Sequence, residues 1–210
     1  LTNPIDGPAR FRAGAFTIPG DISSAAYFIA AAMLLPRSEL TIEAVGLNPT
    51  RAAFLSVLRS WGAELSTTDL RTERNEPIGT INFSDGLRSA VRDEDRTLSG
   101  AMIPSWIDEL PLLAVVGTQV SGGIQIRDAE ELRLKESDRL QATANNLRAM
   151  GAEVDEFDDG IAVNGPTPLH GAAIDSYGDH RIAMAFTLAA LIAEGETEIQ
   201  NPDCGALSFP

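Results

Sequence analysis

The sequence predicts an α/β protein built from repeated units, in which helices and strands alternate along the chain. Two observations predict this class. Three long apolar stretches, at residues 25–32, 110–116 and 182–192, each follow a loop that carries Gly or Pro together with an Asp. After each stretch comes a short polar or Gly break and then a run of alternating apolar and polar residues, which is the period-two pattern of a strand.

The three apolar stretches predict buried helices. Each begins just after a residue that commonly caps a helix, namely Asp21 or Ser23 in the first, Asp108 in the second and Asp179 in the third. Because apolar residues cover every side of these helices, none of them is amphipathic, and a helix of that kind is buried.

The predicted strands follow in the same order, at residues 39–45, 123–127 and 196–200. Two further segments, at residues 58–65 and 147–154, resemble each other: each is an amphipathic helix that ends at a Gly and turns into a strand. The repeated units are therefore roughly 70–90 residues long, which exceeds the period of common solenoids.

The segment from residue 67 to residue 96 is polar, and it predicts one strand near residues 78–83 with loops around it. We place a boundary near Ser66, so that residues 1–66 form the last repeat unit of one domain. Residues 67–210 would then form most of a second globular domain, built of two repeat units. The acidic run at residues 155–160 predicts an exposed hairpin turn.

Composition and charge exclude several classes of protein. Hydrophobic residues make up 44% and charged residues 22% of the 210 residues, as in an ordinary globular protein. A net charge of −14 disfavours nucleic acids and anionic membranes as partners, because both reward a basic surface. The single cysteine, Cys204, excludes an internal disulfide and fits a reducing cytoplasm. We therefore expect a cytoplasmic monomer.

Fingerprints of several chemistries are missing from the sequence. It contains no P-loop, no Gly-x-Gly-x-x-Gly after a strand and no Gly-x-Ser-x-Gly. His170, His180 and Cys204 lack the spacing of metal ligands. We expect neither a metal nor an organic cofactor. The chain starts without a Met or a signal peptide and stops just after an apparent loop, so both ends look cut from a longer chain.

The only lysine of the sequence, Lys135, marks the first candidate site. The charged residues around Lys135, taken by their spacing alone, favour the start of a solvated helix with Ser137 and Asp138 as caps. A lysine is a compact point charge and an arginine is a rigid bidentate fork, so a site that needs both would use Lys135 with Arg139.

Three helix starts offer further candidates. At one of them, Arg181 and the free helix N–H groups would face an anion, because a helix N-terminus carries positive potential; the alternative makes Asp179 a cap and His180 an ordinary first-turn residue. At another, Ser23, Ser24 and Tyr27 offer hydroxyl groups, and a plain serine cap is the alternative.

Asp108 and Glu109 supply carboxylates at the start of the middle helix, and an N-cap is again the alternative. Repeated units packed about one axis would aim all three helix starts at one place.

Four segments resemble the EPSP synthase family in order and spacing. They read Pro-Gly-Asp-Ile-Ser-Ser-Ala from residue 19, Ile-Asp-Glu-Leu-Pro from residue 107, Glu-Leu-Arg-Leu-Lys-Glu-Ser-Asp-Arg from residue 131 and Tyr-Gly-Asp-His-Arg-Ile-Ala-Met from residue 177. The resemblance extends over essentially the whole chain. It implies inside-out α/β barrel domains of repeated βαβαββ units, as in enolpyruvyl transferases. It also implies transfer of the enolpyruvyl group of phosphoenolpyruvate to the 5-hydroxyl of shikimate 3-phosphate, which releases phosphate through a tetrahedral intermediate.

The resemblance also implies roles for individual residues. Ser24, Tyr27, Asp108 and Lys135 would hold shikimate 3-phosphate. Arg139 and Arg181 would grip phosphoenolpyruvate, whose carboxylate and phosphate suit guanidinium forks. Glu136 would protonate the methylene carbon, Asp108 would take or orient the 5-hydroxyl proton, and His180 would support the site by a hydrogen bond.

Two positions depart from the family, because Leu207 stands where some members have Lys and Glu131 where some have Asn. The family's first half, which supplies other phosphoenolpyruvate and phosphate contacts, has no counterpart in the chain. We therefore expect little or no turnover from these 210 residues alone.

Two rival interpretations remain. The related enolpyruvyl transferase that acts on UDP-N-acetylglucosamine shares the repeat architecture, although no nucleotide-sugar feature is evident. A non-catalytic acidic repeat module for partner binding is the other. It predicts that Lys135, Arg139 and Arg181 do not converge.

Overall fold

The computed structural model describes residues 7–8, 13–15, 17–85 and 91–208. Both ends of the chain and part of the loop expected before residue 96 lie outside this range. Within it, no helix is long and apolar enough to cross a membrane.

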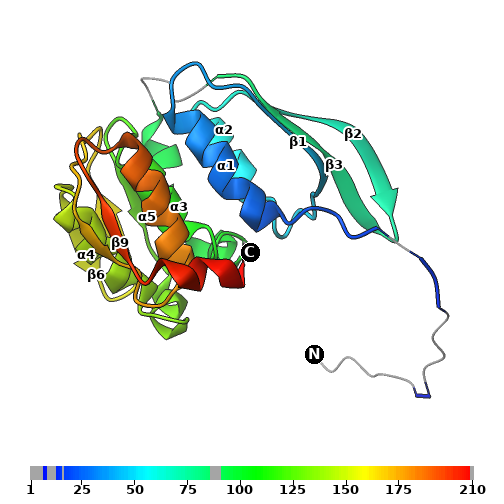
Figure 1. Cartoon of the computed structure of the whole chain (residues 1–210). Coiled ribbons are helices and arrows are strands. Elements are labelled where there is room, and N and C mark those ends of the chain that lie inside the picture. The colour runs from blue at the N-terminus through cyan, green and yellow to red at the C-terminus, as the bar shows by residue number, and fades with distance from the viewer. Residues whose placement is uncertain (1–6, 9–12, 16, 86–90, 209–210) are drawn as a thin grey trace.

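Three apolar helices form the centre of the molecule (Figure 1). They are α1 (Ile22–Leu34), α3 (Leu110–Gly117) and α5 (His180–Ile192), and they pack against one another. Strands lie on the outside, with β1–β3 on one side of the helices and β6 and β9 on the other (Figure 1). The predicted buried helices and the inside-out arrangement are therefore confirmed.

Among the described residues, the strands form three sheets. The first has the antiparallel order β1 (Leu40–Gly46), β3 (Glu76–Phe83), β2 (Leu65–Glu73). The second has the order β4 (Thr97–Leu98), β5 (Ile124–Ile126), β7 (Gly160–Val163), β6 (Val154–Phe157). The third pairs β8 (Ala173–Asp175) with β9 (Glu198–Gln200) in parallel. The acidic run near residue 158 joins β6 to β7, so the predicted hairpin is confirmed.

The two predicted amphipathic helices are α2 (Phe54–Ser60) and α4 (Arg139–Ala149). Each is followed by a glycine with a positive φ, 108° at Gly62 and 91° at Gly151, and then by β2 or β6. Glycine suits these positions because it reaches positive φ at little cost. Short 3₁₀ helices complete the described chain, at Asp93–Arg96, Gly100–Ser105, Glu130–Leu134 and Pro202–Leu207.

Aspartates cap two of the three central helices. Asp21 accepts a hydrogen bond from Ser24 N and Asp179 accepts one from Arg181 N. At α3 the expected cap is wrong, because Glu109 occupies the N-cap position without a capping bond from its side chain. The carboxylates of Asp108 and Glu109 face arginine and serine side chains instead.

The first sheet continues through the boundary predicted near Ser66. Ser66 lies within β2 and pairs with Asn82 of β3, so a boundary there would cut a strand out of its sheet. Phe54 and Phe186, on either side of that position, belong to one hydrophobic core. Alternating apolar and polar residues predict that a strand exists, but they do not predict which strand it pairs with. In the structure β3 pairs with both β1 and β2.

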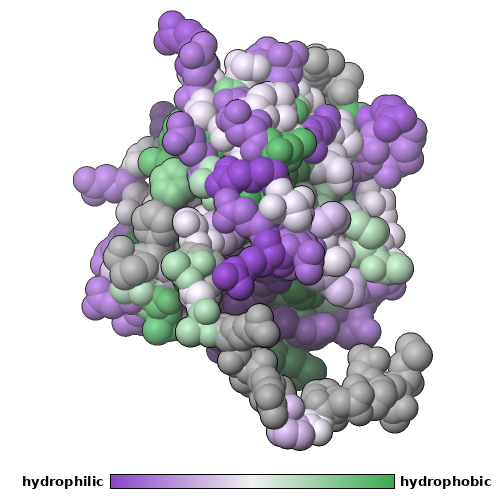
Figure 2. Space-filling view, turned by 90° about the vertical axis from the view of Figure 1, so that its right-hand side faces the viewer, coloured by the Kyte–Doolittle hydropathy of each residue, from purple (hydrophilic) through white to green (hydrophobic). Residues whose placement is uncertain are grey.

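The outer face of the molecule is polar. Figure 2 shows a largely hydrophilic surface on the side toward the first sheet, with apolar side chains scattered among polar ones. β2 contributes to it, because most of its residues are exposed. The apolar surface of this unit is directed inward, onto α1 and α2.

Two leucines on α5 test the position of the core. Leu188 is 4% exposed and Leu191 is 56% exposed. We expect Leu188→Ala to lower the free energy of unfolding by about 2–5 kcal/mol, because it removes buried methyl groups and leaves a cavity. Leu191→Ala on the same helix is the matched control and should cost well under 1 kcal/mol. Urea unfolding followed by circular dichroism measures both, and equal losses would contradict the assigned core.

Candidate anion-binding and catalytic site

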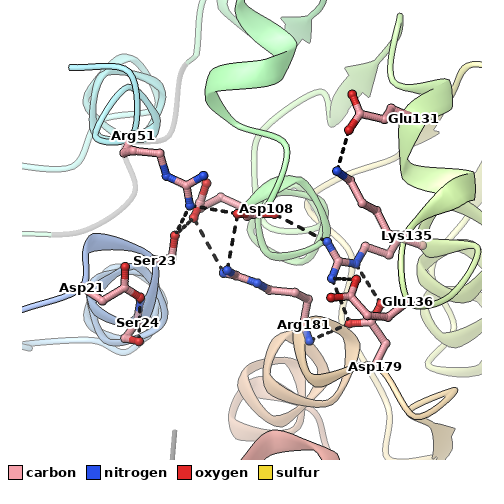
Figure 3. Close-up of polar contacts among 12 residues, drawn as sticks. Asp21, Ser23, Ser24, Arg51, Asp108, Glu131, Lys135, Glu136, Asp179 and Arg181 are labelled. Atoms are coloured by element: carbon pink, nitrogen blue, oxygen red, sulfur yellow. Dashed lines mark hydrogen bonds and ion pairs between the residues drawn. The ribbon is translucent and has the colours of Figure 1, made fainter. Parts of the chain in front are cut away.

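The N-termini of the three central helices meet at one place (Figure 3). Ser23 of α1 donates a hydrogen bond of 2.5 Å to Glu109, which stands at the start of α3. Arg181 in the first turn of α5 lies 3.5 Å from Asp108. Because each helix N-terminus carries positive potential, this meeting point favours an anion. The convergence expected from the repeated units is present.

Asp108 lies among three guanidinium groups. Its Oδ2 accepts a hydrogen bond of 2.8 Å from Arg51 Nη2 and is 3.5 Å from Arg181 Nη2. Its Oδ1 is 3.6 Å from Arg139 Nη1. Partial burial raises the pKa of Asp108, but the Arg51 hydrogen bond and the three positive charges outweigh it and lower the pKa overall. Asp108 is therefore an anion near neutral pH.

Arg139 is held by a buried carboxylate. Its side chain is 2% exposed, and its Nε donates a 2.8 Å bond to Asp179, which is fully buried. Asp179 also accepts bonds from Ser137 Oγ and from Arg181 N. Burial raises the pKa of Asp179, but the bonds and charge of Arg139 outweigh it and lower that pKa overall. Glu136, which is half exposed, accepts a 2.6 Å bond from Arg139 Nη2.

Glu109 differs from its neighbour Asp108 in the direction in which its surroundings move its pKa. Its side chain is 2% exposed, it accepts the Ser23 hydrogen bond, and its Oε1 is 3.8 Å from Arg181 Nη1. Burial is the main cause that raises the pKa of Glu109. Two adjacent carboxyl groups with pKa values moved in opposite directions are typical of sites that transfer protons.

Three buried polar atoms of this region lack a hydrogen-bond partner among the described residues: Tyr27 OH, His180 Nδ1 and Arg181 Nε. Burial raises the pKa of Tyr27 to about 12, so its hydroxyl keeps its proton. Burial and the charge of Arg181 lower the pKa of His180 and favour the neutral ring. Native proteins pair nearly all such atoms, so this group marks a place where a ligand or water completes the bonding.

Not every expected residue joins the cluster. Lys135 Nζ donates a 2.5 Å bond to Glu131, and Figure 3 shows this contact apart from those of Asp108. Ser24 Oγ donates to Asp21 within the cap of α1. The enzyme interpretation requires Lys135, Arg139 and Arg181 to face one cleft. Arg139 and Arg181 converge on Asp108, whereas Lys135 is paired with Glu131.

Two members of the cluster, Arg51 and Asp179, were not expected from the sequence as ligand-binding residues. Arg51 is 57 residues from Asp108 along the chain, and nothing in its own segment signals the contact. Asp179 was expected to cap a helix, and it does so, but it also binds Arg139. Glu109 was expected to supply a carboxylate at the start of the middle helix, but no role in the site was assigned to it. No group of three or more potential metal ligands occurs among the described residues.

The arrangement of central helices with strands outside them matches the fold of the enolpyruvyl transferases. The solved enolpyruvyl transferase NikO from Streptomyces tendae matches 92% of this chain and 41% of its own, with a TM-score of 0.68 and 22% identity, which shows the fold alone. The chain belongs to the EPSP synthase family: the model of EPSP synthase (3-phosphoshikimate 1-carboxyvinyltransferase) matches residues 2–210.

Relatives in this family are similar along almost the whole chain. A 3-phosphoshikimate 1-carboxyvinyltransferase from Koribacter versatilis is 52% identical over 206 residues, which are 98% of this chain and 47% of the relative. One from Synechococcus sp. is 45% identical over 209 residues, covering 100% of this chain and 46% of the relative. The solved EPSP synthase from Acinetobacter baumannii has a TM-score of 0.82 at 36% identity, covering 92% of this chain and 44% of that one. The chain thus spans about half the length of these relatives.

The pair of Arg139 and Asp179 predicts a pH-dependent stability. Because the pKa of Asp179 is lowered in the folded chain, its ionised form stabilises the fold above the ordinary Asp range, and this contribution is lost as the pH falls through the lowered pKa. Asp179→Asn removes the only fully buried carboxylate that the described structure places against Arg139, so we expect a loss of about 3–5 kcal/mol at pH 7. The difference from the unchanged chain should shrink in acid.

Urea unfolding at several pH values measures this difference. Asp155→Asn, which changes an exposed carboxylate on β6, is the control and should change stability little at any pH. A deficit in Asp179→Asn that stays constant down to strongly acidic pH would contradict the assigned ion pair.

Proposed function

We propose that this chain forms one wall of the site at which the enolpyruvyl group of phosphoenolpyruvate is transferred to the 5-hydroxyl of shikimate 3-phosphate. The products are 5-enolpyruvylshikimate 3-phosphate and phosphate. The observation that carries this proposal is the convergence of Arg51, Arg139 and Arg181 on Asp108, where three helix N-termini meet. In a chain with net charge −14, such a cluster of cations suits reactants that carry phosphate and carboxylate groups. Membership of the family supports the reaction.

Phosphoenolpyruvate would bind to Arg181 and Arg139. Arg181 has free donor capacity, because its Nε has no hydrogen-bond partner among the described residues and its contacts with Asp108 and Glu109 are long, at 3.5 and 3.8 Å. Asp179 holds the Nε side of the Arg139 guanidinium, so that its Nη1 lies toward Asp108. A guanidinium that is already fixed loses little entropy when it binds.

Shikimate 3-phosphate would contact Asp108, Tyr27 and His180, with Ser23 in support. The unpaired hydroxyl of Tyr27 and the ring nitrogen of His180 can complete their bonding on the ligand. Lys135 would exchange its bond with Glu131 for the ligand, and Ser24 its bond with Asp21. The exchange at Lys135 costs little, because exposed ion pairs contribute about 0–1 kcal/mol.

Proton transfer would use Asp108 and Glu136. Asp108 is ionised and can accept the proton of the 5-hydroxyl as that oxygen bonds to the enolpyruvyl carbon. Glu136 is half exposed and would donate a proton to the methylene carbon, giving the tetrahedral intermediate. The new methyl group then returns a proton to Glu136 as the double bond re-forms and phosphate leaves, and the leaving phosphate takes the proton that Asp108 holds. General acid–base help of this kind contributes about 10²–10⁴-fold.

The described residues would form one domain of three units, each a central helix with its sheet, rather than parts of two domains divided near Ser66. The shared core and the unbroken first sheet support this division. A cytoplasmic monomer without nucleic-acid partners is the simplest assembly for a strongly acidic chain.

Binding tests the assignment of Arg181. We expect the chain to bind shikimate 3-phosphate weakly in calorimetry, and more tightly when phosphoenolpyruvate is present. Arg181→Met should weaken the joint binding by tenfold or more, on the order of one charge-assisted hydrogen bond. Arg71→Met, which removes an exposed arginine paired with Glu73, is the control. The assignment fails if Arg181→Met binds as tightly as the unchanged chain; Lys135→Ala separately tests the contact with shikimate 3-phosphate.

Turnover tests the need for a second wall. The 210-residue chain alone should release no phosphate from the two substrates, because it cannot enclose them. A chimera in which the chain replaces the matching half of the relative with 52% identity should be active. In that chimera, Asp108→Asn and Glu136→Gln should lower kcat by about 10²–10⁴-fold. Turnover by the chain alone would contradict the first expectation, and full activity of Glu136→Gln would contradict its assigned role.

A further inference from the structure

Arg51 connects the first repeat unit to the candidate catalytic carboxylate. It lies in the segment before α2, and its Nη2 donates to Asp108 Oδ2 at 2.8 Å and to Ser23 Oγ at 2.9 Å. Ser23 in turn donates to the buried Glu109. One nitrogen of Arg51 therefore links the starts of α1 and α3.

Four charged groups face Asp108, from the segments around α2, α3, α4 and α5: Arg51, Glu109, Arg139 and Arg181. Among them, Arg51 alone makes a hydrogen bond with the carboxylate in the described structure. Arg139 directs its Nε to Asp179, and Arg181 stands 3.5 Å away. Removing Arg51 would therefore free Asp108 Oδ2 from its only short contact in this part of the chain.

An ordinary surface ion pair would not have this effect. Exposed pairs contribute about 0–1 kcal/mol, and the Arg51 side chain is 44% exposed. Asp108, however, is only 22% exposed, and the Arg51 nitrogen also binds Ser23, a buried residue. A hydrogen bond shared between a partly buried carboxylate and a buried hydroxyl fixes both acceptors.

We infer that Arg51 is a positioning residue for the reaction: it holds Asp108 Oδ2 so that Oδ1 is left to accept the proton of the substrate hydroxyl. The orientation and ionisation of Asp108 follow from the contacts alone. The effect on turnover rests on the proposed function.

The lowered pKa of Asp108 gives a test that does not need turnover. In the 210-residue chain, ¹³C NMR can follow the titration of the Asp108 carboxyl carbon, which is assigned by its disappearance in Asp108→Asn. In Arg51→Met the titration midpoint should move to higher pH, because the hydrogen bond and one of the three positive charges are gone. Arg51→Lys should give a smaller shift, because it keeps the charge and loses the guanidinium.

Arg71→Met is the matched control. Arg71 is also 44% exposed and is also 2.8 Å from a carboxylate, that of Glu73 on β2. It should leave the Asp108 midpoint unchanged. An unchanged midpoint in Arg51→Met, in a chain whose circular dichroism shows it folded, overturns the inference. If Arg51→Met does not fold, the same comparison is made with Arg51→Lys.

The active chimera supplies the second measurement. There, Arg51→Met should lower kcat about tenfold while the KM for phosphoenolpyruvate stays unchanged, and the acidic limb of the pH profile should move to higher pH with the midpoint. A loss of kcat without a shift of the acidic limb of the pH profile would overturn the positioning role. A shifted NMR midpoint together with an inactive unsubstituted chimera would support the Arg51 contact and contradict the proposed function instead.

Discussion

The buried ion pair between Arg139 and Asp179 is the interaction on which the rest of the site depends. It joins the first turn of α4 to the N-cap of α5, and both side chains are almost completely buried. The same Asp179 carboxylate accepts the backbone N–H of Arg181, so one group sets the start of α5 and the position of its first arginine. A charge this deeply buried requires its partner, which explains why so many donors surround Asp179.

The site has positive potential although the chain as a whole is strongly negative. A chain of net charge −14 repels anions at long range, yet the candidate ligands are anions. Three helix starts and three arginines produce a local positive region, and the carboxylates among them hold the arginines in place without neutralising every donor. The unpaired atoms of Tyr27 and Arg181 show where that bonding is left incomplete.

Much of the fold could be predicted because local patterns carry it. Apolar runs predicted α1, α3 and α5, alternation predicted β1, β5 and β9, and Gly62 and Gly151 marked the ends of two helices. The cap expected at α3 was wrong because the Asp108 carboxylate has partners that are distant in sequence, among them Arg51, which lies 57 residues away.

The sequence by itself determined the class of fold, the family and the segments that contain the site, because local periodicity or a short motif is enough to identify each of them. Only the tertiary structure decided which side chains meet. It brought Arg51 to Asp108 across 57 residues and directed Lys135 to Glu131 instead of the cluster. The physical reason is that a charged side chain pairs with whichever opposite charge the packing of the helices brings within a few ångströms, and that packing is a property of the whole core.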